Sequence, residues 1–400
     1  MKRTYRQSKM FDYAINTAKK HNATVIVGAG TRGMELLTEL AYNHVFIKTI
    51  FDNDPLKIGM QEKGITVEKP HLVLSDDILY IVAVDDMYVR SELVLQLINL
   101  GIKKEQIMEF SFKDDFSYYQ YAKSLSESNY KAEVDGLYEE VFGKKINWLA
   151  PKTYNEKLNW EKIYINNTKK TQCADKYLVR NYVREVIGEQ YLTKLYGVWE
   201  KAEDIDFVAL PKSFVLKLNN GSGHNIVVKD KSQLQVVKTI KLLNYWLNLN
   251  LFYLTFERQY KDISPRILCE EYLPGVAESI YDYQFYCFNR AVQYIWCING
   301  SHLPNCKASF YNNEWKLQPF AYGYPADTFV HEKPTHFDKM INIAKTLCKE
   351  FSHVRIDLYD LPDGRIIFGE MTFTTWAGLM KFVPNEYDEE WGNLLPDYKL

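Results

Sequence analysis

Short apolar runs alternate with longer stretches of mixed polarity in the first quarter of the chain. Three runs are rich in β-branched residues and have the length of buried strands: 23–27, 46–51 and 78–84. The segments 33–40 and 91–100 carry apolar residues at helical spacing, and Gly101 ends the second segment. Strands that alternate with helices predict a parallel sheet, so we expect an α/β domain over residues 1–112.

The pattern changes after residue 112. Residues 113–150 are polar, rich in tyrosine and without strand patterns, which predicts a helical connection between two domains. A helical section follows Pro151, and the later pattern predicts seven strands, an amphipathic stretch and a helix: strands 214–218, 225–228, 267–270, 282–288, 291–298, 354–358 and 365–370, stretch 234–254 and helix 337–351. This mixture predicts an α+β domain over residues 151–400.

Composition excludes several classes of function. The chain has 49 Lys and Arg against 51 Asp and Glu, so no basic field is present to hold nucleic acid or an anionic membrane. The longest apolar run, 78–84, is far shorter than the roughly 20 residues of a membrane-spanning helix. The six cysteines form no C-x-x-C pair, which indicates reduced thiols and a cytoplasmic location.

A glycine motif lies between the first expected strand and helix. Gly28, Gly30 and Gly33 would let a phosphate approach the start of the helix, and Asp52, at the end of the next strand, would bind a ribose. This half also resembles the small Rossmann-like domains attached to sugar-modifying acetyltransferases and methyltransferases. The motif therefore predicts either a site for a nucleotide-sugar or dinucleotide, or a purely structural turn.

A second glycine motif lies in an expected hairpin. Lys217 is near the end of strand 214–218, and Gly221, Ser222 and Gly223 form a flexible loop before the returning strand. Loop amides and a lysine ammonium can together neutralise a triphosphate. The loop lacks the Gly-Lys-Ser/Thr ending of a P-loop, so a tight hairpin with a surface lysine is the alternative.

Three further features favour a nucleotide site over a bare hairpin. Lys176 lies at the start of an expected helix, and the strand through Glu270 and Glu271 continues into an acidic and aliphatic hinge. Asp357 and Glu370 lie on neighbouring expected strands. Two carboxylates that close would repel unless a divalent cation lay between them, and Mg²⁺ on nucleotide phosphates needs only one or two such ligands. A solvated hairpin with surface charges is again the alternative.

In this order, these pieces resemble the ATP-grasp superfamily, and most closely the TupA-like family of teichuronopeptide and capsular polysaccharide biosynthesis. The resemblance covers roughly residues 154–382. It is carried by five groups of residues: Ala174-Asp175-Lys176, Lys217 with Asn220-Gly221-Ser222-Gly223, Pro265-Arg266 before Glu270-Glu271-Tyr272-Leu273, Tyr322-Gly323-Tyr324-Pro325, and Val354-Arg355-Ile356-Asp357 with Phe368-Gly369-Glu370. It implies an α+β ATP-grasp domain that binds ATP and Mg²⁺.

The resemblance also implies roles for single residues. Those expected to hold the nucleotide are Lys176 and Lys217 on its phosphates, the 221–223 loop as a lid, Glu270, Glu271 and Leu273 as the adenine hinge, and Glu278 or Asp282 on the ribose. Those expected at the reacting groups are Lys307 on the terminal phosphate, Asp357, Glu370 and Thr372 on Mg²⁺, and Arg355 on an acyl-phosphate.

Two departures from the family pattern concern the acceptor side. Gln284 stands where the family has a lysine, and Thr375-Trp376-Ala377-Gly378 replaces a turn richer in Pro, Gly and Ser. The lysines and the magnesium acids remain, which favours an active enzyme. We therefore expect an ATP-dependent carboxylate–amine ligase.

Such a ligase would form an amide through an acyl-phosphate, in capsular or cell-wall polysaccharide biosynthesis. The resemblance suggests that a sugar, such as a uronic acid, bears either the carboxylate or the amine and is joined to an amino acid or amino alcohol. The carboxylate substrate would be a small molecule or a polysaccharide precursor, and an amine would be the co-substrate. Three alternatives stay open: a nicotinamide-dependent sugar oxidoreductase built on the Gly28 motif, a non-catalytic nucleotide-binding assembly module, and phosphoryl transfer to a sugar hydroxyl. The sequence specifies neither the substrates nor the number of subunits.

Overall fold

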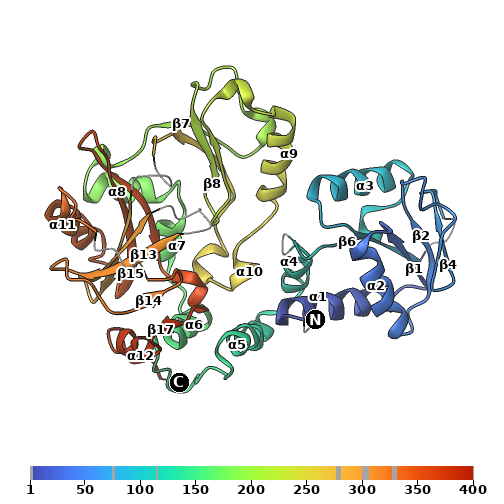
Figure 1. The fold of residues 1–400 in the computed structure, drawn as a ribbon, viewed down its shortest axis with the longest axis horizontal. Helices are drawn as coiled ribbons and strands as arrows, with labels where there is room; N and C mark the ends of the chain where they lie inside the picture. Colours follow the sequence, from blue (N-terminus) through green and yellow to red (C-terminus); the bar gives the residue numbers. More distant parts are fainter. Residues whose placement is uncertain are drawn as a thin grey trace. The chain divides into compact units, whose positions relative to one another are not determined.

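The computed structural model describes residues 3–73, 77–113, 116–275, 281–299, 306–326 and 331–399. The chain forms two compact units, Met1–Asn129 and Tyr130–Leu400, and the boundary between them lies within helix α5 (Glu127–Phe142). Figure 1 shows the elements of both units in sequence colours.

The first unit is built on a six-stranded sheet with the order β3-β4-β2-β1-β5-β6. Every neighbouring pair is parallel except β3 with β4. The strands are β1 (Ala23–Val27), β2 (Ile47–Phe51), β3 (Gln61–Glu62), β4 (Ile65–Glu68), β5 (Ile78–Ala83) and β6 (Ile107–Phe110). The helices before α5 are α1 (Tyr5–Ala18), α2 (Thr31–Tyr42), α3 (Met87–Asn99) and α4 (Phe116–Lys123). After β1, the chain first adds β2 on one side of β1 and later adds β5 on the other side. The direction in which strands are added therefore reverses beside β1.

Both faces of this sheet are covered, which explains the unbroken apolar runs of its strands. Every residue of β1 and of β5 is buried. Alternate residues of these strands form one cluster with α3: Val25, Val27, Tyr80, Val82, Leu93 and Leu97. The α/β architecture expected for this part of the chain is confirmed.

The second unit contains two larger antiparallel sheets. A four-stranded sheet has the order β7-β10-β8-β9, and a five-stranded sheet has the order β13-β12-β11-β15-β16. The strands of the first are β7 (Leu195–Trp199), β8 (Phe214–Leu218), β9 (Asn225–Val228) and β10 (Ile267–Glu271). Those of the second are β11 (Asp282–Phe288), β12 (Ala291–Asn299), β13 (Lys307–Asn312), β15 (His353–Asp360) and β16 (Ile366–Thr372). A short pair, β14 (Ala321–Tyr322) and β17 (Phe382–Val383), completes the described strands.

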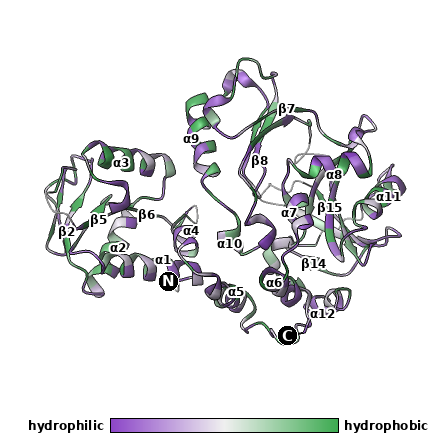
Figure 2. Ribbon diagram, turned by 180° about the vertical axis from the view of Figure 1, so that it is seen from behind, coloured by the Kyte–Doolittle hydropathy of each residue, from purple (hydrophilic) through white to green (hydrophobic). Residues whose placement is uncertain are grey.

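Helices frame these sheets. They are α6 (Tyr154–Tyr164), α7 (Thr168–Ala174), α8 (Val179–Val186), α9 (Val236–Leu247), α10 (Phe252–Thr255), α11 (Phe337–Leu347) and α12 (Glu386–Gly392). The amphipathic stretch expected at 234–254 is thus divided into α9 and α10. Helix α9 is largely hydrophobic in Figure 2, and its residue Val237 is 70% exposed.

An aromatic cluster joins α6 and α12 to the five-stranded sheet. Trp391 of α12 is fully buried and lies 5.4 Å, ring to ring, from Tyr154 of α6. The remaining buried aromatic members come from the five-stranded sheet, from the β14–β17 pair and, in Phe320, from the residue before β14: Tyr286, Phe288, Trp296, Phe310, Phe320, Tyr322 and Phe382. Edge-to-face pairs of this kind add to the stabilisation from buried area. This core fixes the C-terminal segment against the start of the unit.

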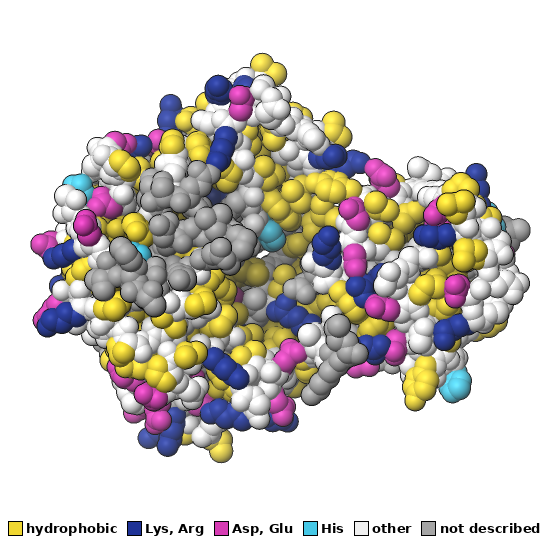
Figure 3. All heavy atoms as spheres, in the orientation of Figure 1, with side chains coloured by type: hydrophobic (Ala, Val, Ile, Leu, Met, Phe, Trp, Pro, Cys, Tyr) yellow, Lys and Arg dark blue, Asp and Glu magenta, His cyan; other side chains and the backbone are white. Residues whose placement is uncertain are grey.

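The surface carries charges of both signs. On the face shown in Figure 3, Lys and Arg side chains are interspersed with Asp and Glu. No helix in the described ranges is both long and apolar enough to cross a bilayer.

Candidate nucleotide and metal site

The four-stranded sheet brings Lys217 next to Glu270. The two residues are diagonal neighbours on the antiparallel strands β8 and β10, and Lys217 Nζ lies 2.6 Å from Glu270 Oε2. Glu270 also accepts hydrogen bonds from Arg180 of α8 at 3.1 Å and from Thr193 Oγ1 at 2.9 Å. Burial opposes ionisation of Glu270, but Lys217 and Arg180 hold its pKa below the ordinary value. The carboxylate is therefore an anion between two fixed cations.

The end of β10 combines a polar edge with an apolar surface. The Glu271 carboxylate forms an ion pair with Arg365 at 3.1 Å, and the Glu271 amide donates to Lys194 O at 2.9 Å. Leu273 is 7% exposed and packs in a small cluster with Leu361 and Ile367. Because the Glu270 side chain turns to Lys217, an adenine contact at this residue would fall to its backbone. The Leu273 cluster offers the apolar surface that a purine ring would need.

Lys176 connects the glycine loop to the five-stranded sheet. The backbone N–H of Lys176 donates a hydrogen bond to Asn219 O at 3.1 Å. The preceding residue, Asp175, accepts a hydrogen bond from Asn219 Nδ2 at its Oδ2, at 2.9 Å. Both contacts fix the backbone at Lys176. Its ammonium donates to Gly221 O at 2.5 Å and lies 3.4 Å from Glu370 Oε2. One lysine therefore contacts both the loop after β8 and a carboxylate of β16.

The glycine loop is anchored at its base and exposed at its tip. His224 stacks on Trp246 of α9 with ring centroids 5.0 Å apart. Burial, together with a nearby lysine, lowers the pKa of His224 to about 4, so the imidazole is neutral at pH 7. Gly223 has φ +74°, and a Cβ on Gly221 would lie 2.8 Å from His224 Nδ1. Ser222 and Gly223 are exposed. Ser222 and Gly223 are therefore accessible to a ligand while His224 stays packed against Trp246.

Two carboxylates of the neighbouring strands β15 and β16 share one arginine. Arg355 donates to both oxygens of Asp357, at 2.7 and 2.6 Å, and to Glu370 Oε1 at 3.0 Å. Thr372 Oγ1 also donates to Glu370 Oε1 at 3.0 Å. Burial opposes ionisation of Glu370, but Lys176 and Arg355 lower its pKa to about 2. The expected magnesium acids and the expected acyl-phosphate arginine thus lie together.

The donor set at this point fits a magnesium ion. Asp357, Glu370 and Thr372 offer oxygens, and Gln284 of β11 lies directly opposite Asp357 in register. Gln284 Nε2 donates to Asp282 Oδ2 at 2.8 Å, whereas its buried Oε1 has no hydrogen-bond partner among the described residues. Water or a cation can satisfy a buried amide oxygen of this kind, so Gln284 Oε1 is compatible with a bound metal.

The acids here are few, as a nucleotide-bound metal requires. Nowhere in the described ranges do three or more His, Cys, Asp or Glu side chains gather to hold a metal by themselves. Mg²⁺ usually takes one or two carboxylates and completes its octahedron with phosphates and water. The two carboxylates Asp357 and Glu370 match the number that a Mg²⁺–nucleotide complex takes from a protein.

Of three further expected residues, Asp282 is described in full, Lys307 only in its backbone, and Glu278 not at all. Asp282 begins β11 opposite Tyr359 of β15, so it is placed on the same sheet as Asp357. Glu278 and the side chain of Lys307 lie outside the described residues. The backbone of Lys307 begins β13, opposite Asn299.

In the first unit, the three expected glycines have different structural roles. Gly28 has φ +105°, a conformation that side chains disfavour. A Cβ on Gly33 would lie 1.8 Å from Gly28 O, so only glycine permits this approach of α2 to the turn. Gly30 caps α2, and a Cβ there would meet no atom within 4 Å. Gly28 and Gly33 therefore build the turn, and Gly30 leaves space beside it.

Asp52, the expected ribose acid, already has partners within the protein. It accepts hydrogen bonds from the amides of Ala29 at 2.7 Å and Asp54 at 2.8 Å, and Lys57 Nζ lies 3.2 Å away. Burial opposes its ionisation, but these contacts lower its pKa. The carboxylate thus ties β2 to the glycine turn, and a ribose would have to share it.

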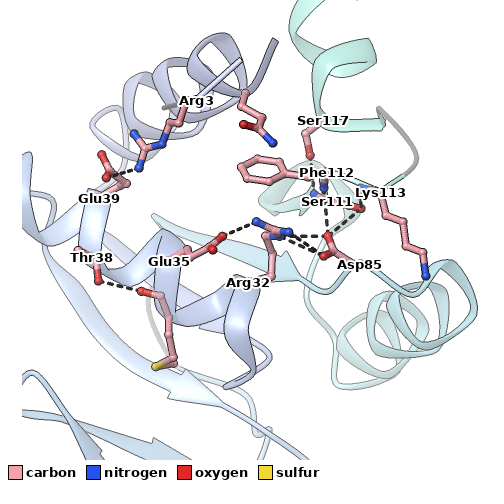
Figure 4. Close-up of polar contacts among 12 residues, drawn as sticks. Arg3, Arg32, Glu35, Thr38, Glu39, Asp85, Ser111, Phe112, Lys113 and Ser117 are labelled. Atoms are coloured by element: carbon pink, nitrogen blue, oxygen red, sulfur yellow. Dashed lines mark hydrogen bonds and ion pairs between the residues drawn. The ribbon is translucent and has the colours of Figure 1, made fainter. Parts of the chain in front are cut away.

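An open pocket of about 590 Å³ lies beside the start of α2, lined by Arg3, Ala29, Gly30, Thr31, Met34, Glu35, Thr38 and Glu39. Figure 4 shows Arg32 reaching from α2 to Asp85, just after β5, at the point where the sheet reverses direction. Arg32 Nη2 donates to Asp85 at 2.8 Å, and Arg32 also pairs with Glu35. An anion bound here would have to compete with these carboxylates for Arg32.

Sequence reasoning missed Arg180. It lies four residues after Lys176 and is 8% exposed, paired with Glu270. Lys176 lies in the turn that precedes α8 rather than in the helix, so helical spacing does not link it to Arg180, and no motif in the sequence marks Arg180.

Comparison with known proteins gives the following. A family model described as TupA-like ATPgrasp matches residues 156–396. Among solved structures, an L-amino acid ligase from Bacillus licheniformis shares 12% identity, with a TM-score of 0.36, 94% of this chain covered and 76% of that one. A D-alanine–D-alanine ligase from Bacillus anthracis complexed with ATP shares 12% identity, with a TM-score of 0.33 and coverages of 88% and 85%. A search of curated proteins found no match. With TM-scores this low, the assignment rests on the family model.

Proposed function

We propose that this chain, which belongs to the TupA-like ATP-grasp family, is an ATP-dependent carboxylate–amine ligase whose acid substrate is borne by a sugar, such as a uronic acid, or by an amino acid. The product would be an amide in a capsular or cell-wall polysaccharide precursor. The resemblance of the sequence motifs to the TupA-like family of teichuronopeptide and capsular polysaccharide biosynthesis supports the polysaccharide context, and the reaction's need for ATP supports a cytoplasmic location.

One observation carries the assignment of the site. Lys176 is 2.5 Å from Gly221 O in the glycine loop and 3.4 Å from Glu370 in the carboxylate pair. Lys217 lies at the end of the strand that precedes the same loop. Lys176 thus joins the glycine loop to the carboxylate pair, and Lys217 lies on the strand before that loop. A magnesium-bound triphosphate requires such a combination of charges, which supports the proposal.

The reaction needs activation because a carboxylate has no adequate leaving group. In the proposed mechanism, the substrate carboxylate attacks the γ-phosphoryl group of ATP, ADP leaves, and an acyl-phosphate forms. Lys176, Lys217 and Lys307 hold the phosphates and neutralise charge on the moving phosphoryl group. Mg²⁺, held by Asp357, Glu370 and Thr372, would supply further charge neutralisation when bound.

The second step forms the amide. The amine attacks the acyl carbon, the tetrahedral oxyanion collapses, and inorganic phosphate departs. Arg355 would donate to this oxyanion, and removal of such a donor typically costs about 10² to 10³ in rate. The loop 221–223, with Ser222 and Gly223 exposed at its tip, would cover the acyl-phosphate and keep water from hydrolysing it.

We further propose that the first unit binds the nucleotide end of a nucleotide-sugar, with residues 1–112 as the binding domain, 113–150 as the connection and 151–400 as the catalytic domain. The pocket beside Gly30 and the strand order of the sheet support this. Calorimetry of the full chain with UDP- and GDP-sugars and NAD tests it. Binding that Gly30→Val leaves unchanged would contradict it.

The ligase assignment is tested by a phosphate-release screen of uronic acids, their nucleotide derivatives and amino acids against a panel of amines. With ¹⁸O-labelled acid, ligation transfers label to the released phosphate, whereas phosphoryl transfer to a hydroxyl does not. ATP binding without turnover on any pair would favour an assembly module. A change in nicotinamide absorbance that is indifferent to Lys217→Ala would favour the oxidoreductase.

A further inference from the structure

The chain turns in a left-handed conformation shortly after the magnesium acids. Trp376, Ala377 and Gly378 have φ of 51°, 53° and 62° in succession. The left-handed conformation is unfavourable for residues with a Cβ, most of all for a bulky one, and runs of it are rare. Such backbone persists only where the surroundings enforce it, and it gathers at functional sites.

Helix α6 enforces this turn from below. Lys162 Nζ donates to Ala377 O at 2.5 Å, Asn159 Nδ2 donates to Gly378 O at 2.7 Å, and Asn155 Nδ2 donates to Met380 O at 2.9 Å. Residues 155, 159 and 162 follow the i, i+4, i+7 spacing of one helix face. All three side chains are buried. A buried polar stripe is therefore dedicated to the carbonyls of a strained turn.

The turn presents the indole of Trp376 at the surface. Trp376 is 39% exposed, although its ring centroid lies 5.7 Å from that of Tyr324 and 6.5 Å from that of Trp296. A Cβ on Gly323 would lie 2.7 Å from Trp376 Nε1, so the indole packs closely over this glycine. The half-exposed ring is thus held in place rather than free to rotate.

Strand register relates the neighbourhood of this indole to the expected magnesium site. Trp296 of β12 is opposite Gln284 of β11, and Gln284 is opposite Asp357 of β15. Two strand spacings separate Trp296 from Asp357, about 10 Å. A sugar acid could place its carboxylate at the metal site. Its six-membered ring would then extend from there toward the side of the sheet where Trp296 and Trp376 lie.

We propose that Trp376 is a stacking platform for the sugar ring that bears the substrate carboxylate, and that it selects a pyranose-borne acid over an acid without a ring. The inference rests on the proposed function and names its substrate class. A pyranose has a C–H face that suits the electron-rich indole face, and a hydroxyl edge that stays hydrated or meets the Tyr324 side of the platform. Lys162 and Asn159 are positioning residues that hold the platform.

The experiment compares binding of three probes to the full chain in the presence of Mg²⁺ and a non-hydrolysable ATP analogue. The probes are D-glucuronate, the ring-free acid glutarate, and UDP. Wild-type protein is compared with Trp376→Ala and Trp376→Phe by calorimetry and by quenching of tryptophan fluorescence. Trp315→Phe is the matched control, because Trp315 stacks on Tyr311 elsewhere in the unit at 4.1 Å.

We expect Trp376→Ala to weaken glucuronate binding about tenfold, Trp376→Phe to weaken it less, and glutarate binding to change less than twofold. The control should leave all three affinities unchanged. Glucuronate binding within twofold of wild type in Trp376→Ala, equal weakening for glutarate, failure of glucuronate to bind wild type, or equal dependence of UDP on Trp376 would each overturn the proposal.

Phosphate release separates this inference from the proposed function. If glucuronate binds through Trp376 but no acid supports phosphate release with any amine, the ligase proposal fails and the platform stands. If phosphate is released with glucuronate and Trp376→Ala leaves its KM unchanged, the ligase stands and the platform fails.

Discussion

Replacing Lys217 with methionine should separate its structural effect from its effect on ATP. Glu270 is 4% exposed, and its carboxylate lies 2.6 Å from Lys217 and 3.1 Å from Arg180. At an effective dielectric constant of 20, each cation contributes about 5 to 6 kcal/mol of gross attraction. Lys217 thus supplies about half of what offsets dehydration of the carboxylate. Because Arg180 and Thr193 remain, we expect the free energy of unfolding to fall by about 2 to 3 kcal/mol, rather than the larger loss of a fully unpaired charge.

The double variant Lys217→Met/Glu270→Gln distinguishes the two effects. A neutral amide still accepts from Arg180 and requires no second cation, so the free energy of unfolding should return to within about 1 kcal/mol of wild type. Affinity for ATP should not return. Loss of a charge-assisted hydrogen bond to phosphate removes about 1.5 to 3 kcal/mol, or about 10- to 150-fold in affinity.

Urea unfolding followed by tryptophan fluorescence measures the stability, because all eight tryptophans lie at or beyond residue 148 and report on the second unit. Calorimetry measures affinity for ATP. Lys212→Met is the control, since Lys212 is 80% exposed and pairs with Asp230 at 3.7 Å. A double variant that binds ATP like wild type would refute direct phosphate contact by Lys217. An unchanged stability in the single variant would refute the ion-pair reasoning.

Three further outcomes are expected. Gly33→Ala should lower the free energy of unfolding by about 1 to 3 kcal/mol, because its Cβ would meet Gly28 O at 1.8 Å, whereas Gly30→Ala should lower it by less than about 1 kcal/mol. Hydrogen exchange of residues 23–42 measures both changes. Equal effects of the two variants would contradict the packing argument. Glu370→Gln should raise the Mg²⁺ concentration needed for half-maximal activity at least about tenfold, and its stability difference from wild type should shrink as the pH falls from about 4.5 toward 2, because the folded-state pKa is lowered to about 2. Burial lowers the pKa of His353 to about 4, so the unfolded chain binds a proton at this residue at a higher pH than the folded chain. The free energy of unfolding should therefore fall by up to about 3 kcal/mol between pH 6.5 and 4. In urea titrations His353→Gln should reduce this dependence on pH, and an unchanged dependence would contradict the role of His353.

The parts of the fold that the sequence predicts well are those with a single dominant pattern. β1, β2 and β5 are buried on both faces and appear as unbroken apolar runs, and β8 begins and ends at the residues expected. Elements without such a pattern were missed. β3 has only two residues, and α12, Glu386–Gly392, is mostly acidic, so its sequence does not reveal that Asp388, Trp391 and Gly392 are buried.

The candidate site divides in a similar way. Lys176, Lys217, Asp357 and Glu370 are recognisable because their residue types and order match a family. Lys176 contacts Glu370, Arg355 joins Glu370 to Asp357, and Lys217 contacts Glu270. Arg180 and the polar stripe of α6 follow no motif, since they act through partners remote in the chain: Lys162 bonds to Ala377, 215 residues later. Contacts at such separation arise from topology, which local spacing does not encode.

The hydrogen bonds between α6 and the C-terminal segment affect how the protein folds during its synthesis. Lys157 also bonds to the carbonyls of Gly392 and Leu395, so α6 depends on residues translated more than 200 positions after it. Loop closure over such a span is slow compared with local pairing. A nascent chain halted before residue 377 would therefore expose the polar stripe of α6 to water and lack the acceptor turn, and ribosome-bound intermediates of this enzyme should be inactive until the last helix emerges.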